Sequence, residues 1–235
     1  MGAIFRRELK AYFTSPIAYI FIAVFYIYTS TFFASYNLYY GTTDMSTSFT
    51  TAFTIIMILL PLLTMRLFTE EKRQRTDQCL LTAPINLFSI VMGKFFAAVC
   101  VFLCAMAIYV LYVITLVALA GSVAWATVIG NFVALLLLGA SFISIGIFVS
   151  AMTESQVVAA IVSFIIIMLF YMIDIFAGNV QVEWLRTVMS SVGFYTRYYE
   201  FSTGIFSVPS LVFFLSAIFI FNFLTVRALE KRRWA

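Results

Sequence analysis

The chain has 235 residues, of which 64% are hydrophobic and 10% are charged, and its formal net charge is +4 at pH 7. A soluble domain usually contains about 45–50% apolar and about 25% charged residues, so this chain could not cover its surface with polar groups in water. The composition therefore excludes a soluble globular protein and predicts an integral membrane protein whose apolar exterior faces lipid.

Residues 1–15 predict a short amphipathic helix at the N-terminus. Phe5, Leu9 and Phe13 share one face of this helix, and the basic residues lie largely on another face. A helix of this kind suits the inner headgroup layer of a membrane, and we expect it there. The alternative is that the basic residues only flank the first membrane span, with their charges reaching the interface. These basic residues are Arg6, Arg7 and Lys10.

Six continuous apolar runs follow, and each has about the 20 residues that a helix needs to cross the ~30 Å hydrocarbon core. Backbone groups in lipid must satisfy one another, which leaves helices or closed barrels. The runs lack the alternation of apolar and polar residues that is typical of barrel strands. We therefore predict an all-α integral membrane fold with six transmembrane helices. The expected spans are 17–37, 49–68, 95–120, 129–151, 157–177 and 208–226.

The positive charges are distributed unevenly between the two sides of this arrangement. All but two of the 14 Lys and Arg residues lie in the N-terminal arm, in the segment from the end of the second run to the start of the third, or in the C-terminal tail. The two exceptions are Arg186 and Arg197. Because cytoplasmic segments carry an excess of Lys and Arg, both termini are predicted to be cytoplasmic, with the chain in the plasma (inner) membrane.

Residues 69–84 concentrate charge between the second and third runs. Acidic residues precede basic ones, which matches a helix dipole, and Glu71 and Arg75 have the i,i+4 spacing of an ion pair. We predict a short charged helix on the cytoplasmic side, tied at both ends to spanning helices and able to transmit a push. The alternative is a solvated connector with ordinary cytoplasmic charges. The candidate residues are Glu70, Glu71, Lys72, Arg73 and Arg75.

Residues 178–207 form an outer segment that is rich in aromatic residues and too short for a domain of its own. Such residues suit the membrane interface, and we predict two short helices that re-enter the outer leaflet. Asp174, near the outer end of the fifth run, is expected to act at the interface rather than in a proton relay. Arg197 and Glu200 are spaced to form a weak ion pair.

Small residues recur along the run 129–151, where Ala140 with Ser144 and Gly146 with Ser150 have the spacing that lets helices approach closely. This pattern indicates tight packing, either within the chain or between subunits.

The sequence contains no histidine and no phosphate-binding loop, because Gly93-Lys94 lacks both the upstream glycine and the following Ser or Thr. Cys100 and Cys104 lie one helical turn apart in an apolar run and are expected to serve packing rather than a metal. We therefore expect a non-catalytic chain with no metal site, and no nucleic acid among its partners.

Three stretches of the chain carry a family resemblance: FRRELKAYFTSPIAYIF, TEEKRQRTDQCLLTAPINLFSIVMGKFF and SAMTESQVVAAIVSF. Together they resemble the permease subunits of ABC-2-type ATP-binding cassette transporters, and this resemblance covers nearly the whole chain as one transmembrane domain, residues 1–235. The second stretch is the most specific, with an acidic pair, basic residues, a Leu-Leu-x-x-Pro segment and Gly-Lys at the third span. Arg75-Thr76 stands where many members have Gly-Thr. The chain looks most similar to the branch with gliding-motility permeases and the accessory permease of nitrous oxide reductase.

The resemblance implies a role for each cytoplasmic and outer segment. Residues 69–84 would be the coupling helix, seated in a cleft of a separate ABC ATPase subunit, with the five charged residues named above as contacts. Residues 1–15 would be an interfacial elbow helix, and residues 178–207 an outer re-entrant hairpin. A second permease subunit would complete a homodimer or heterodimer, with the first, second and fifth spans near the seam.

The function implied by the resemblance is to couple ATP hydrolysis in the partner to export or movement of an unidentified substrate. The chain itself would bind no cofactor, and ATP with Mg²⁺ would sit on the ATPase. Besides the ATPase and the second permease subunit, the expected partners are membrane lipid and an extracytoplasmic protein. One alternative is a mechanotransmission subunit that drives such an extracytoplasmic partner rather than a solute, and another is a structural anchor without an ATPase. A lipid-like or large amphipathic cargo is favoured over small ions.

Overall fold

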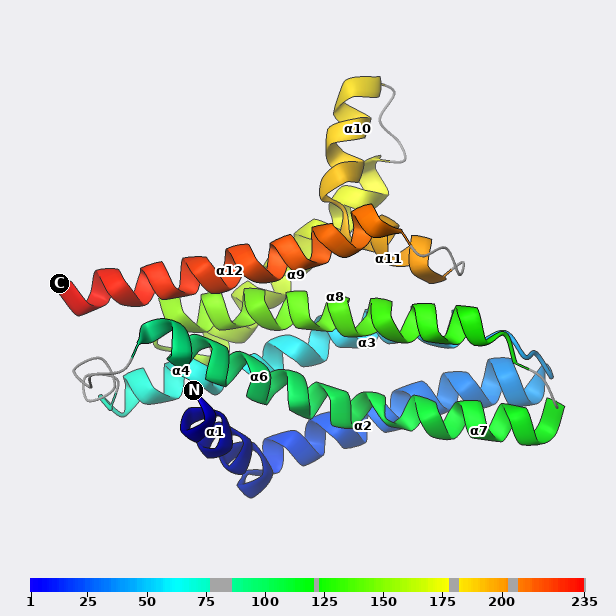
Figure 1. The fold of residues 1–235 in the computed structure, drawn as a ribbon, viewed down its shortest axis with the longest axis horizontal. Helices are drawn as coiled ribbons and strands as arrows, with labels where there is room; N and C mark the ends of the chain where they lie inside the picture. Colours follow the sequence, from blue (N-terminus) through cyan, green and yellow to red (C-terminus); the bar gives the residue numbers. More distant parts are fainter. Residues whose placement is uncertain (77–85, 121–122, 178–181, 203–206, 235) are drawn as a thin grey trace.

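In the computed structural model, the described residues are 1–76, 86–120, 123–177, 182–202 and 207–234, and within these ranges the chain forms helices and no strand (Figure 1). Six helical segments are long and apolar enough to cross a membrane, which confirms the predicted fold class. These segments are Pro16–Tyr39, Ser46–Arg73, Leu87–Leu119, Trp125–Met152, Gln156–Ala177 and Val208–Arg232.

The elements follow one another in a simple order along the chain, and several spans are built from two helices. Their bounds are α1 (Gly2–Thr14), α2 (Pro16–Phe33), the π-helix η1 (Ala34–Tyr39), α3 (Ser46–Thr64), α4 (Arg66–Arg73), α6 (Leu87–Met106), α7 (Ile108–Ala120), α8 (Trp125–Met152), α9 (Gln156–Ala177), α10 (Glu183–Val192), α11 (Phe194–Ser202) and α12 (Val208–Trp234).

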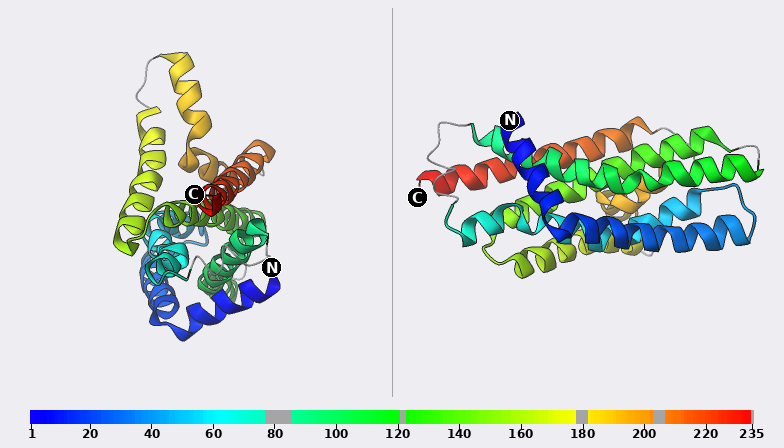
Figure 2. Two further views of the ribbon diagram at one scale, coloured as in Figure 1. Left: turned by 90° about the vertical axis from the view of Figure 1, so that its left-hand side faces the viewer. Right: turned by 90° about the horizontal axis from the view of Figure 1, so that it is seen from below.

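Helix α8 is the central element of the bundle. It packs against α3, α6, α9 and α12. Of its most apolar 18-residue stretch, 72% is buried within the chain, compared with 22% for α9. Both termini and α4 lie toward the same end of the bundle (Figure 1). Helix α1 lies across that end, at a steep angle to α2 (Figure 2, right). Its depth in a bilayer stays a prediction, whereas its helical structure is observed.

The small residues of the fourth span bring α8 close to its neighbours within the chain. A Cβ atom added at Gly146 would lie 2.0 Å from Thr64 Oγ1 on α3. On the opposite neighbour, α12, Asn222 Nδ2 donates a hydrogen bond of 2.9 Å to Ser144 Oγ. Of the two possibilities that the sequence left open, these contacts establish tight packing inside one subunit.

The third span departs from the continuous helix that its apolar run suggested. It is interrupted at Ala107, between α6 and α7, although neither proline nor glycine lies there. The Tyr26 hydroxyl of α2 donates a 3.0 Å hydrogen bond to the Cys104 carbonyl just before the interruption. A side chain that bonds into the backbone ladder is a known cause of such breaks.

Helices α9 and α10 form a hairpin that leans away from the bundle (Figure 2, left), while α11 returns to it. Asp174 of α9 caps the first turn of α11, accepting hydrogen bonds from Tyr195 N (2.8 Å) and Thr196 Oγ1 (2.6 Å). The expected Arg197–Glu200 pair is present at 3.6 Å. The helices are those expected in 178–207, although 178–181 and 203–206 lie outside the described residues and the re-entrant position stays a prediction.

Candidate functional site

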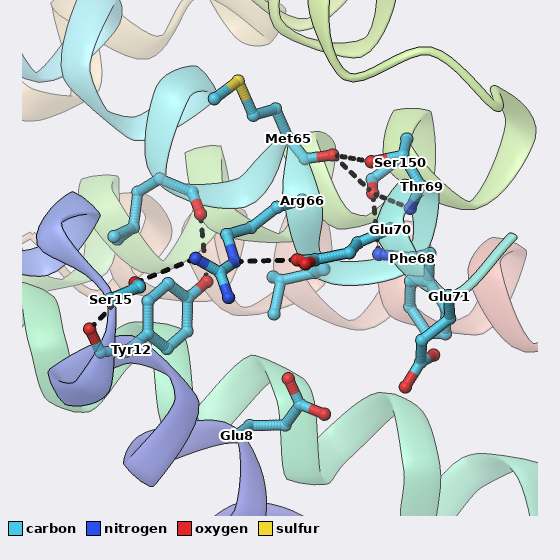
Figure 3. Close-up of polar contacts among 12 residues, drawn as sticks. Glu8, Tyr12, Ser15, Met65, Arg66, Phe68, Thr69, Glu70, Glu71 and Ser150 are labelled. Carbon is cyan, nitrogen blue, oxygen red and sulfur yellow. Dashed lines mark hydrogen bonds and ion pairs between the residues drawn. The ribbon is translucent and has the colours of Figure 1, made fainter. Parts of the chain in front are cut away.

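Helix α4 continues the second span toward the end of the bundle that holds the termini. A single residue, Met65, separates it from α3, and Arg66 pairs with Glu70 across one turn at 3.2 Å. Arg66 also donates a 2.8 Å hydrogen bond to Ser15 Oγ, at the junction of α1 and α2 (Figure 3). The charged segment therefore starts within a span and is tied to the N-terminal arm from its first residue.

The charged helix is shorter than the predicted segment 69–84 and begins earlier, because α4 covers Arg66–Arg73. Arg75 has φ of +55°, and the amides of Arg75 and Thr76 bond to the carbonyls of Lys72 and Glu71. This is the Schellman arrangement, in which a left-handed residue ends a helix. The expected Glu71–Arg75 pair is therefore wrong, since Arg75 has already left the helix. Residues 77–84 of the prediction lie outside the described residues.

Replacing Arg75 by glycine is expected to strengthen this helix end. A left-handed conformation costs an L-residue roughly 1–2 kcal/mol, and glycine avoids that cost. We expect Arg75→Gly to raise the free energy of unfolding by up to about 1 kcal/mol, since glycine also loses more entropy on folding. Thermal unfolding in detergent would measure this, with Arg73→Gly as the control. Because Arg73 is helical, that substitution should be destabilising, and stabilisation by both or neither would contradict the prediction.

The end of α8 holds α4 through reciprocal capping, and Figure 3 shows the contacts of Ser150. Ser150 Oγ accepts hydrogen bonds from the amides of Phe68 (3.0 Å) and Thr69 (3.3 Å), and it donates to the Met65 carbonyl at 3.2 Å. In return, Lys72 Nζ donates to the carbonyls of Ala151 and Thr153, which end α8. Unpaired amides at a helix start and unpaired carbonyls at a helix end are thus satisfied across the contact between the two helices.

Four charged side chains join α4 to α1 and α6, and we refer to Arg7, Glu8, Glu71 and Lys94 as the ionic ring. Lys94 Nζ lies 3.1 Å from Glu8 Oε1 and 3.0 Å from Glu71 Oε1. Arg7 Nη2 lies 2.5 Å from each of the same two oxygens. Positive and negative groups alternate around the ring, so its net charge is zero.

Two members of the ring, Glu8 and Arg7, lie outside the membrane-spanning segments and have shifted pKa values. Burial raises the pKa of the Glu8 carboxyl, but the Lys94 ammonium and the Arg7 guanidinium more than offset this effect, so the pKa lies below the ordinary value of 4.5. Burial of the Arg7 guanidinium acts to lower its pKa, but the carboxylates of Glu8 and Glu71 outweigh this effect. The pKa of Arg7 is therefore raised above its ordinary value. Glu8 and Arg7 are therefore fully ionised at neutral pH.

The five charged residues predicted to form the site divide into two groups. Arg73 and Arg75 are exposed at the end of α4, and the Glu70 side chain is 38% exposed. Glu71 and Lys72 turn inward, to the ionic ring and to α8.

Among the N-terminal residues, Arg6 and Lys10 are exposed, whereas Arg7 belongs to the ring. The predicted residues therefore divide into those that bind α4 to other helices of the chain and those that α4 leaves exposed on the surface.

Glu8, Lys94 and Ser150 were not among the predicted site residues. Lys94 carried a signal, since it belongs to the Gly-Lys pair at the third span and is a cation next to an apolar run. Glu8 is the single acidic residue of the N-terminal arm, which is otherwise basic. Ser150 was noticed only as a small residue, and its capping role depends on a contact between distant segments.

Comparison with known proteins gives one family match for the chain. A model of the ABC-2 family transporter proteins matches residues 46–189, which is more than half of the chain. No curated protein matches the chain. The matched region includes α4, Lys94 and Ser150, and members of this family are generally non-catalytic membrane components that work with an ABC ATPase. The closer resemblance to one branch stays a prediction. The chain therefore belongs to the ABC-2 family of transporter proteins and is a multi-pass membrane permease of an ABC transporter.

Proposed function

We propose that this permease couples ATP hydrolysis by a separate nucleotide-binding subunit to the export or movement of a substrate, and that α4 is the contact between the two. The observation that carries the proposal is the position of α4, a charged eight-residue helix at the end of the bundle that holds both termini. It is fastened to three other helices and still leaves Arg73 and Arg75 exposed.

Fastening of this kind is what force transmission needs. A helix joined only by its chain ends would turn under load, whereas α4 is also bonded to α8 through Ser150 and to α1 and α6 through Glu71. A displacement applied at Arg73 and Arg75 would reach α3 through the chain and α8 through the caps. Because α8 is the central helix of the bundle, a displacement of α8 would also move the helices packed against it.

The remaining partners follow from the same placement. ATP and Mg²⁺ would be held by the nucleotide-binding subunit, since this sequence has no phosphate-binding loop. The position of both termini near α4 supports a cytoplasmic location for all three in an inner membrane. Helices α2 and α9 are among the least buried spans, at 28% and 22% of their apolar windows, and offer faces to lipid and to a second permease subunit.

Reversing the two exposed charges is expected to release the nucleotide-binding subunit. Each reversed contact should cost about 1–1.5 kcal/mol, so Arg73→Glu with Arg75→Glu should weaken binding by about 30–150-fold. Permease-dependent ATPase activity should fall with binding. The measurement is titration of the purified nucleotide-binding subunit onto the permease in nanodiscs, together with ATP hydrolysis.

The control carries the same change of charge at exposed sites on two other helices. Arg186 in α10 and Lys231 in α12 are both exposed, so Arg186→Glu with Lys231→Glu should bind the nucleotide-binding subunit as the wild type does. If the Arg73/Arg75 variant binds and stimulates as well as this control, α4 is not the contact and the proposed function loses its basis.

A further inference from the structure

Lys94 has an unusual environment for a lysine in a spanning helix. Its side chain is 1% exposed, and its ammonium contacts Glu8 Oε1 at 3.1 Å, Glu71 Oε1 at 3.0 Å and the Leu67 carbonyl at 2.6 Å. An ammonium has three donors, so each one has an acceptor here. The ring of Phe68 also lies 4.9 Å from Nζ, in the range of a cation–π contact.

These contacts connect three helices at one atom. Lys94 belongs to α6, Glu8 to α1, and the other acceptors to α4, which Lys94 therefore holds through both a side chain and the backbone. The preceding residue contributes as well, because a Cβ atom at Gly93 would lie 3.0 Å from Ile4 Cγ2. Gly93 thus lets α1 lie close on α6, and Lys94 fixes α1 there by charge.

Stability alone does not explain a buried group of this kind. Removing charges from water is costly, and well-packed apolar residues of similar volume are often as stable as a buried ion pair. A buried ion network does, however, favour one arrangement of its helices over others, because moving one helix leaves a charge unpaired. The ring would therefore resist any separation of α4 from α1 and α6.

We propose that Lys94 is a positioning residue that makes the coupling helix, the N-terminal helix and the third span move as one unit. The inference rests on the proposed function and extends it: the load received by α4 passes to α1 and α6 through the ionic ring, in addition to the path through α8. Lys94 does not contact the ATPase, since its side chain is buried within the permease.

The test removes one cation and one anion together, so that the ring stays neutral. In Glu8→Gln with Lys94→Met, the remaining Arg7–Glu71 pair keeps its partner, and the long apolar side chain of methionine fills most of the space of the lysine. The nucleotide-binding subunit should bind with unchanged affinity, while the permease-stimulated turnover of ATP should fall roughly tenfold, within the range typical of coupling between sites. Lys94→Arg keeps the cation and should retain most of the stimulation.

Arg227→Met with Glu230→Gln is the matched control, because it removes an exposed ion pair of 2.7 Å on α12. It should leave both binding and turnover unchanged. Should the Glu8/Lys94 variant fail to fold, Glu8→Gln alone keeps an acceptor for Lys94 and should give a smaller loss of turnover at unchanged affinity.

Three results would overturn the inference. Wild-type turnover in the Glu8/Lys94 variant would show that the ring transmits nothing, and a loss of binding affinity equal to the loss of turnover would show that it serves docking. If Lys94→Arg retained no more of the permease-stimulated turnover of ATP than Lys94→Met, the positive charge at this position would have no part in transmission. If instead the wild-type permease neither binds nor stimulates any nucleotide-binding subunit, the proposed function itself fails.

Discussion

Ser150→Ala is expected to lower the free energy of unfolding by roughly 2–4 kcal/mol and to loosen α4 from α8. The hydroxyl accepts from two amides, those of Phe68 and Thr69, and both residues are buried. A buried donor that loses its acceptor costs about 1–3 kcal/mol, and the longer bond to Thr69 contributes less than the bond to Phe68. Alanine fits the space, but its methyl group cannot accept hydrogen bonds from these amides.

Ser141→Ala is the matched control on the same helix. Ser141 is fully buried like Ser150, but its hydroxyl donates to carbonyls, at 2.9 Å to Leu137 and 3.4 Å to Phe214. The Leu137 carbonyl also lies within a helical ladder, so the loss should stay below about 1 kcal/mol. Unfolding of both variants in detergent would compare them, and permease-stimulated ATP hydrolysis should fall only for Ser150→Ala. Equal destabilisation by the two variants would mean that capping of α4 contributes little.

The sequence was sufficient for the membrane fold because lipid imposes strong local rules. Each span has to be long, apolar and helical, and these properties can be read within about 20 residues. The prediction of six spanning helices is confirmed. The interruption at Ala107 could not be predicted, because it involves Tyr26 on another helix, and no local residue marks it.

The candidate site was predictable only in part, for a related physical reason. Concentrated charge indicated that a short helix lies between the second and third spans, but not which way each side chain turns. Glu71 was matched with Arg75 because both lie on one segment, whereas the structure pairs it with Arg7 and Lys94 from distant segments. Arg75 itself takes the left-handed conformation that ends α4, so it cannot lie one helical turn from Glu71.

Gly146→Ala is expected to destabilise the permease by about 2–3 kcal/mol, because the added methyl group would collide with α3. Its carbon would lie 2.0 Å from Thr64 Oγ1 and 2.8 Å from Thr64 Cβ, so the two helices must separate. In Gly130→Ala, the control on the same helix, the new carbon would meet one atom within 4 Å, the Phe201 carbonyl oxygen at 3.2 Å, and the cost should be much smaller. Detergent unfolding of both variants measures the difference, and equal costs would contradict the close approach.

This prediction can be joined to the first one, because Gly146 and Ser150 lie one turn apart on the same face of α8. Their neighbours Thr64 and Phe68 are also four residues apart, so a shift of α8 away from Thr64 should lengthen the bonds from Ser150 to α4. The costs of Gly146→Ala and Ser150→Ala should therefore not add, and the double variant should lose less stability than the sum of the two single variants. Thr64→Ala should recover part of the loss in the Gly146→Ala background, since it removes the nearest atom while leaving Cβ in place. Strict additivity, or no recovery with Thr64→Ala, would show that the junction of α3 and α4 does not depend on this contact with α8.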